Sequence, residues 1–265
     1  MGVGLNHYAD RIELDSKSLK IINGGRLECR APFIFDHFAY GAGAFNSHVP
    51  QNWVATETGT GTPFARGASG ITVATGATGT VTDNGEELAG KNVCWNPSTM
   101  GDRVRLVCEA RFKAVGTTTA TDGDFYFGFA DAVTYTSSLP YVVSAASALT
   151  TSVPTEFCGF AYSSIPTSGA LYSASGNLIG AVTTIANANT VTASTKVKDS
   201  SYHIYRVELD ASGNAAFYYD DALVMTVAAA VTANTAFTPY LSAVAKASHV
   251  HTVTLDYLYV GGDIS

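Results

Sequence analysis

The chain of 265 residues is poor in charge, poor in cysteine and free of long apolar runs. Only 14% of its residues are Asp, Glu, Lys or Arg, and the net charge is −7. No basic stripe is present to neutralise phosphates, which excludes a typical nucleic-acid-binding surface. No segment approaches the ~18 apolar residues of a membrane-spanning helix, and no basic amphipathic segment indicates a membrane surface. We therefore expect neither a nucleic-acid partner nor a membrane partner.

The number and spacing of the cysteines indicate whether the protein contains disulfide bridges. They are widely spaced and form no C-x-x-C pair: Cys29, Cys94, Cys108 and Cys158. Two disulfide bridges are compatible with this number, but four buried thiols in a reducing cytoplasm are favoured. Cys108 shares one face of an alternating run with apolar residues, which predicts a place in the core. The N-terminus lacks a basic stretch followed by an apolar one, so we expect no secretory signal peptide.

Ala, Thr, Gly, Ser and Val are abundant, whereas long amphipathic helical patterns are missing. Thr and Val suit pleated strands, and Gly and Ser suit the turns between them. The chain is long enough for one large β-sandwich or two small domains. Because turn signals recur from about residue 36 onward, we favour one closed two-sheet domain over residues 36–265.

The clearest strand pattern lies between residues 202 and 260. Its first run alternates apolar and charged positions: Tyr205, Arg206, Val207, Glu208 and Leu209. A Ser-Gly-Asn turn follows at 212–214, then an aromatic run with Phe217 and Tyr219, then an Asp-Asp turn at 220–221. Period-two alternation interrupted by turn residues predicts a β-meander, which ends in the late LDYLYV strand.

Earlier segments carry the same signal. Residues 33–38, 52–59, 70–76, 103–113 and 156–163 are predicted strands, and Phe125, Phe127 and Phe129 line one face of another. Residues 171–172 and 187–198 supply weaker strand candidates. An acidic turn is predicted at 83–87, which includes Glu86 and Glu87. Residues 1–35 have denser charge and no long period, and we interpret them as an N-terminal arm or a pair of edge strands.

The order of the last strands resembles the C-terminal half of concanavalin A-like (LamG/glucanase-type) jelly rolls. The resemblance implies an all-β, two-sheet antiparallel jelly-roll sandwich, a fold used by lectins, glycanases and many virion proteins. The segments NWVATETGTGTPFA, SGITVATGATGTVTDNGEEL, RVRLVCEARFK and DFYFGFADA further resemble structural proteins of tailed-phage particles. This similarity covers roughly residues 33–260 and rests on pattern and turn placement.

Catalytic and cofactor signals are weak. Glycanases of the resembling superfamily carry an E-x-D-x-x-E strand, in which alternation places two carboxylates on one face. Glu208 and Asp210 are two apart, but no third carboxylate follows them, so we expect no enzyme. His249 and His251 share a strand face without further ligands nearby, and the acidic residues of the 122–124 loop and Asp131 lack EF-hand spacing. We expect no metal and no cofactor.

The remaining candidates are contact residues. Exposed aromatics could stack on sugar rings or form protein contacts, and we select Tyr202, Tyr218 and Trp95. Apolar positions of the arm would gain from docking on a partner: Ile12, Leu14, Ile21 and Ile22. The sequence thus predicts a non-enzymatic virion protein that decorates or stabilises a phage capsid exterior. Its expected partners are the major capsid protein and copies of itself, as a dimer or trimer. The alternative is a lectin-like module of a tail fibre or receptor-binding protein that binds a host surface glycan.

Overall fold

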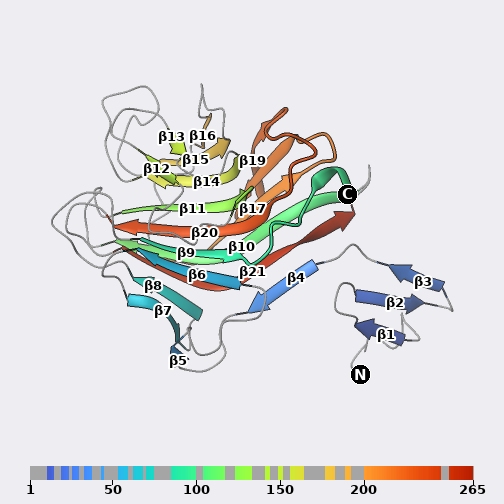
Figure 1. Ribbon diagram of the computed structural model, residues 1–265, viewed down its shortest axis with the longest axis horizontal. Coiled ribbons are helices and arrows are strands. Elements are labelled where there is room, and N and C mark those ends of the chain that lie inside the picture. The colour runs from blue at the N-terminus through green and yellow to red at the C-terminus, as the bar shows by residue number, and fades with distance from the viewer. Residues whose placement is uncertain are drawn as a thin grey trace.

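In a computed structural model of the chain, two antiparallel β-sheets are stacked face to face (Figure 1). The structure describes the backbone of residues 11–14, 19–23, 26–29, 33–37, 43–44, 53–58, 62–67, 70–74, 85–99, 104–116, 123–132, 141–143, 149–151, 156–163, 177–182, 189–191, 200–245 and 251–264. It describes the side chains of residues 53–54, 87–99, 105–115, 125–132, 156–160, 200–243 and 252–262. No helix in these ranges is long and apolar enough to cross a membrane.

The larger sheet has nine strands among the described residues, in the order β19-β18-β17-β10-β21-β8-β7-β5, with β4 also paired to β21. Its strands are β4 (Phe33–His37), β5 (Gly43–Ala44), β7 (Thr62–Gly67), β8 (Gly70–Ala74), β10 (Val104–Gly116), β17 (His203–Leu209), β18 (Ala215–Tyr219), β19 (Ala222–Val227) and β21 (His251–Ile264). The long strands β10 and β21 pair along their whole length and form its centre.

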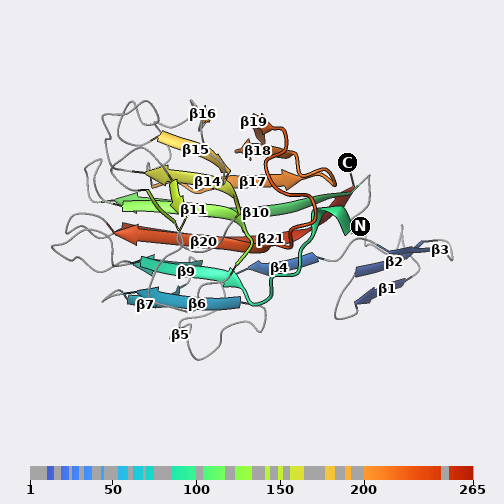
Figure 2. The same cartoon turned by 45° about the horizontal axis from the view of Figure 1, so that its top comes forward.

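The second sheet has seven described strands in the order β16-β15-β14-β11-β20-β9-β6, most of which can be followed in Figure 2. They are β6 (Trp53–Thr58), β9 (Gly85–Gly90), β11 (Gly123–Ala130), β14 (Phe157–Ser163), β15 (Asn177–Val182), β16 (Asn189–Val191) and β20 (Thr238–Ala245). A 3-10 turn, η3 (Pro97–Thr99), and a separate hairpin of β12 (Tyr141–Val143) and β13 (Leu149–Thr151) complete this part. The predicted all-β jelly-roll sandwich is confirmed.

An aromatic core joins the two sheets. Its largest members are fully buried: Phe112, Phe125, Phe127, Phe129, Phe160, Tyr205 and Phe217. The Phe112 ring stacks on Tyr205 with centroids 4.1 Å apart, and Phe160 meets Tyr205 edge-on at 5.5 Å. Such ring pairs add about 0.5–1.5 kcal/mol beyond the burial of their surface. The predicted inward faces of residues 125–129 and 205–209 are therefore confirmed.

The predicted meander is confirmed for its first three strands, whereas the LDYLYV strand, in β21, pairs with β10, β8 and β4 and does not follow β19 in the sheet. β17 pairs with β18, and β18 pairs with β19, through turns at 212–214 and 220–221. Asp220 and Asp221 have φ values of 48° and 64°, which fits a tight hairpin between twisted strands. Asp220 is held there by His203, whose Nδ1 lies 2.7 Å from Asp220 Oδ2.

Residues 1–35 contain three described strands: β1 (Arg11–Leu14), β2 (Leu19–Asn23) and β3 (Arg26–Cys29). They form their own antiparallel sheet, and no strand pairing described in the structure joins it to the sandwich. Figure 1 shows this small sheet beyond the N-terminal start of β4. Because β4 begins at Phe33 and pairs with β21, the sandwich already includes residues before position 36.

Two expectations are wrong. Glu86 and Glu87 do not lie in a turn, since both belong to β9 and pair with β6 and β20. Cys94 is exposed, whereas Cys108 and Cys158 are buried free thiols. Burial raises the pKa of the Cys108 thiol far above its ordinary value, which keeps it protonated and unreactive. The predicted strand at 171–172 lies outside the described residues.

Candidate functional site

The strand register of β10, β17, β18 and β19 places outward-facing residues in parallel rows. The register pairs Leu106–Leu209, Leu209–Ala215 and Ala215–Val227 define one inward-facing row. The neighbouring row faces outward. It contains the residues next to these four in the chain: Arg105, Asp210, Asn214 and Ala228. The next outward row contains Glu208, Ala216 and Thr226. Residues more than 100 positions apart in the chain thus meet on one face.

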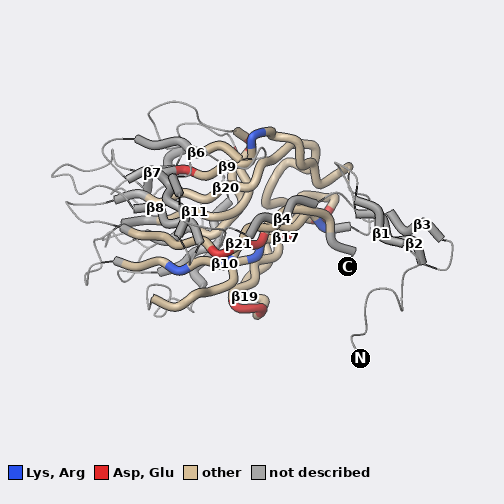
Figure 3. The backbone as a smooth tube through the Cα atoms, turned by 90° about the horizontal axis from the view of Figure 1, so that it is seen from below, with Lys and Arg blue, Asp and Glu red and all other residues tan. Residues whose placement is uncertain are grey.

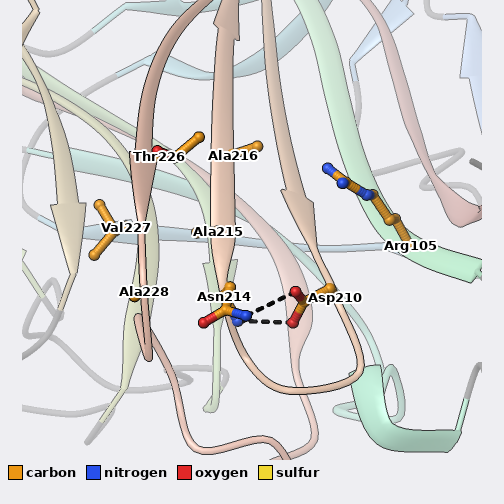
Figure 4. Close-up of a pocket in the computed structure, with 8 residues that line it drawn as sticks. All are labelled: Arg105, Asp210, Asn214, Ala215, Ala216, Thr226, Val227 and Ala228. Atoms are coloured by element: carbon orange, nitrogen blue, oxygen red, sulfur yellow. Dashed lines mark hydrogen bonds between the residues drawn. The ribbon is translucent and has the colours of Figure 1, made fainter. Parts of the chain in front are cut away.

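A pocket of about 250 Å³ lies at the end of the meander, lined by residues of the two outward rows and by Ala215 and Val227 of the inward-facing row (Figure 4). Its lining combines four polar side chains with small apolar ones: Arg105, Asp210, Asn214, Ala215, Ala216, Thr226, Val227 and Ala228. Figure 4 shows Asp210 and Asn214 at the turn and Arg105 reaching in from the neighbouring strand. A concave site with a few placed polar groups on an apolar floor is the usual form of a small-ligand site.

The turn between β17 and β18 holds Asp210 rigidly. Asp210 Oδ1 accepts hydrogen bonds from the backbone N–H groups of Ser212 and Asn214, both at 2.9 Å. The Asn214 amide donates to Asp210 Oδ2 at 2.8 Å, and its oxygen accepts a bond from Ala229 N–H at 2.9 Å. Gly213 has φ +80°, and an added Cβ would lie 2.2 Å from the Val231 carbonyl oxygen. The sequence Asp-x-x-Gly-Asn therefore builds the polar wall of the pocket.

The charge of Asp210 follows from these contacts. Burial, the largest single influence, raises the pKa of this carboxyl group. Hydrogen bonds from Asn214 and Ser212, together with the nearby Arg105 charge, outweigh burial and hold the pKa of Asp210 below its ordinary value. Asp210 therefore presents a carboxylate at neutral pH.

Arg105 is oriented by an ion-pair network on the same face. Glu208 Oε2 accepts a bond from Arg105 Nη1 at 2.9 Å, and Glu208 Oε1 lies 2.6 Å from Arg206 Nη2. Arg206 Nη1 also lies 3.5 Å from Glu109, which accepts a 2.7 Å bond from the Tyr257 hydroxyl. Figure 3 shows basic and acidic positions side by side around β10, β17 and β21. The Glu208 side chain is only 8% exposed, so the carboxylate at the centre of this network is shielded from solvent, whereas the Arg105 side chain is 39% exposed.

The predicted contact residue Tyr218 lies one outward row beyond Ala216. It is half-buried, and the Arg206 guanidinium lies 5.7 Å from its ring centroid. Its partner in the strand register is Leu223, which is 56% exposed. Tyr218 and Leu223 thus form an apolar flank beside the pocket.

The predicted contact residue Tyr202 lies on the same sheet but is already engaged by cations. The Arg111 guanidinium lies 4.7 Å and Lys113 Nζ 5.1 Å from its ring centroid. Burial raises the pKa of Tyr202, Asp256 raises it further, and Arg111 opposes both. Register places it opposite the far end of β10, so the structure does not bring Tyr202 to the pocket.

The other predicted contacts do not join this site. Trp95 is 6% exposed and forms a β-bridge with Phe237, so it is a core residue and offers little surface to a sugar. The backbones of Ile12, Leu14, Ile21 and Ile22 belong to β1 and β2. Their side chains lie outside the described residues, and their docking on a partner stays a prediction.

The metal candidates are mostly outside the described side chains. This applies to His249, His251 and the acidic residues of the 122–124 loop. Among the side chains that are described, no group of three or more His, Cys, Asp or Glu could hold a metal ion.

Comparison with known proteins identifies the fold. No protein-family model matches the chain, and no curated protein matches its sequence. Peanut lectin has a similar structure, with TM-score 0.54 and 12% identity over 88% of this chain and 98% of the lectin. The potassium-bound carbohydrate recognition domain of Emp46p gives TM-score 0.54 and 11% identity over 84% and 94% of the two chains. Bacillus licheniformis β-glucanase gives a TM-score of 0.52 and 9% identity over 86% of this chain and 97% of the glucanase.

These likenesses show that the chain has the concanavalin A-like lectin/glucanase sandwich fold. At such low identities they show the fold alone. Because both lectins and a glucanase are among the similar structures, the fold does not decide whether this protein is an enzyme.

Sequence reasoning missed the pocket although it predicted the strands that form it. From the sequence, Asp210 enters only as part of an incomplete catalytic carboxylate set with Glu208, and nothing in the local pattern marks Arg105 as a site residue. The Asp-x-x-Gly-Asn turn was the available signal, since Asp and Asn in such a turn bond each other and face one side. The register of β10 against β17, which brings in Arg105, could not be read from local spacing.

Proposed function

We propose that this chain is a carbohydrate-binding module, and that its glycan site is the pocket formed by Arg105, Asp210 and Asn214. The observation that carries this proposal is the pocket's composition. A fixed carboxylate, an amide and a guanidinium surround a floor of alanine methyl groups. Hydroxyl groups of a sugar can bond to the polar groups, and the C–H face of its ring can pack on the floor.

The surroundings of the pocket support the same proposal. Tyr218 and Leu223 lie beside it on the same sheet face and could contact a second sugar unit. The fold, shared with a lectin and a carbohydrate recognition domain, agrees with glycan binding without proving it.

The described carboxylates near the pocket support binding over hydrolysis. Glu208 is bonded to two arginines, and Asp210 is bonded to its own turn. The pKa of Asp210 lies below its ordinary value, whereas a general acid for glycoside cleavage requires a raised pKa. We therefore propose a non-enzymatic module.

The proposal also includes the location of the protein in a phage particle. We propose that the module serves a phage tail fibre or receptor-binding protein and contacts a host surface glycan. The capsid-decorating function predicted from the sequence, with the major capsid protein and further copies of the chain as partners, stays a prediction. Binding of the purified protein to host cells supports the first setting, whereas binding only to capsids supports the second.

A glycan array with two matched variants tests the proposed function. Ala228→Trp places a large side chain at the pocket rim, while Ala222→Trp makes the same change at the other end of β19. Both alanines are exposed, so both variants should fold. We expect the wild type and Ala222→Trp to bind the same glycans and Ala228→Trp to lose this binding. Equal binding by all three proteins would exclude this pocket, and absence of any binding would exclude the function.

A further inference from the structure

The hydrogen-bonding capacity left in the pocket is unequal between its two charged groups. A carboxylate has about four lone-pair sites, and Asp210 uses three of them in the bonds from Ser212 and Asn214. Arg105 has about five N–H donors, and its bond to Glu208 uses one. The pocket therefore offers one fixed acceptor position on Asp210 Oδ2 and several donors on Arg105.

A hydroxyl group matches this combination because it both donates and accepts. Two adjacent hydroxyl groups of one ring can donate to Asp210 and accept from Arg105 at the same time. A ligand carboxylate accepts only, so it could bond to Arg105 but would leave two anionic groups facing each other across the pocket.

The charges around the pocket also favour a neutral ligand. The positive charge of Arg105 is already paired with Glu208 at 2.9 Å, and Arg206 is shared between Glu208 and Glu109. Asp210 is ionised, and hydrogen-bond donors of its turn and the charge of Arg105 compensate it. The whole chain carries a net charge of −7, which further repels acidic glycans at a distance.

The volume of the pocket limits the part of the ligand that it encloses to a single ring. At about 250 Å³ it is smaller than the roughly 300–1,000 Å³ of pockets that enclose drug-sized ligands. Small residues line one side of it, which leaves room for a ring and not for a chain of rings.

We infer that the pocket takes one uncharged sugar ring through two neighbouring hydroxyl groups, held between Asp210 and Arg105, and that it rejects acidic sugars. This inference rests on the proposed function and adds the class of sugar. Its selectivity comes from the acceptor of Asp210 and the pairing of Arg105 with Glu208.

Matched sugars that differ by one carboxylate test this selectivity. The probes are methyl glucoside against methyl glucuronide and methyl galactoside against methyl galacturonide, titrated by saturation-transfer NMR. We expect at least one neutral member to bind about tenfold or more tightly than its acidic counterpart, because like charges face each other in the acidic complex.

A charged substitution at the pocket rim tests the preference for neutral sugars in a second way. Thr226 is an exposed pocket residue, so Thr226→Lys adds a positive charge and Thr226→Gln adds similar bulk without charge. We expect Thr226→Lys to reduce the preference for the neutral sugar by several fold and Thr226→Gln to keep it. Tighter binding of acidic sugars by the wild type, lost in Ala228→Trp, would overturn this inference while the proposed function stands. No binding of either class would overturn both.

Discussion

The outward-facing residues of the two sheets differ in their exposure to solvent. On the nine-stranded sheet, some side chains opposite the core remain accessible, with Arg105 39%, Arg111 41% and Leu223 56% exposed, whereas Glu208 and Ala216 on the same face are buried. On the seven-stranded sheet, the residues that alternate with the core are buried: Glu87 1%, Tyr126 0%, Tyr240 0% and Ser242 1% exposed.

This difference locates the candidate binding face. Strand pairing places Tyr126, Ser242 and Glu87 in one row across the seven-stranded sheet. Since this row is shielded from solvent, its contacts contribute to stability. The outward rows of the nine-stranded sheet are partly open, and the pocket lies there. Substitutions on the two sheets should therefore separate stability from binding.

The largest expected difference is between two tyrosines of opposite sheets. Tyr240→Ala removes a fully buried ring that meets Phe157 edge-on at 6.3 Å, and should lower the free energy of unfolding by about 3–5 kcal/mol. Tyr218→Ala removes a half-buried ring and should cost about 1 kcal/mol or less. Urea unfolding of both variants measures these losses in the free energy of unfolding. Equal losses would contradict the proposed difference between the two sheets.

A smaller effect is expected from the ion-pair network. Glu208→Ala leaves Arg105 and Arg206 without their shared partner and should lower the free energy of unfolding by about 1–3 kcal/mol. Glu208→Gln should cost less, because its amide oxygen still accepts a hydrogen bond. Thermal melting of the two variants compares them, and an unchanged Tm for Glu208→Ala would show that the network is not stabilising.

The pH dependence of stability tests the turn of the pocket. The folded pKa of Asp210 lies below its unfolded value of about 3.9. Its carboxylate therefore stabilises the fold above that value, and this contribution disappears as the pH falls through the folded pKa. Asp210→Asn should be less stable than wild type at pH 7, and the gap should narrow below about pH 4. A gap that stays constant down to pH 2 would mean that ionisation of Asp210 plays no part.

The smallest effect on stability is expected at the exposed edge. Leu223→Ser should change the free energy of unfolding by no more than about 0.5 kcal/mol, since the side chain is 56% exposed. If this flank contacts a second sugar unit, binding of oligosaccharides should weaken while binding of single sugars is retained. Isothermal titration with both kinds of ligand measures this, and a large loss of stability would place Leu223 in a packed contact.

Local pattern predicted the fold well because many of the strands carry their own signal, although no local run predicted β20 at residues 238–245. The alternation in residues 205–209 and the phenylalanines at 125, 127 and 129 showed which faces are inward. Glu86 and Glu87 were misassigned because Asn84-Gly85 looks like a turn, and pairing with strands far along the chain overrides that local preference.

The site was harder to predict because it depends on long-range register. Trp95 looked like a surface aromatic, but its bridge to Phe237 buries it, and these residues are far apart in the sequence. Arg105 joins Asp210 only through the pairing of β10 with β17. The burial of Glu87 and Ser242 likewise cannot be deduced from alternation, because the pattern marks two faces and does not say which of them is covered.

The most direct test of the binding face is a map of amide chemical shifts in ¹⁵N-labelled protein, titrated with the neutral glycan that binds most tightly on the array. Our account predicts that the largest shifts fall at Ser212, Gly213, Asn214 and Ala228, the residues around the pocket of the nine-stranded sheet. Largest shifts in β9, β11 and β20 would contradict it, because they would place the glycan on the face that the structure shows as buried.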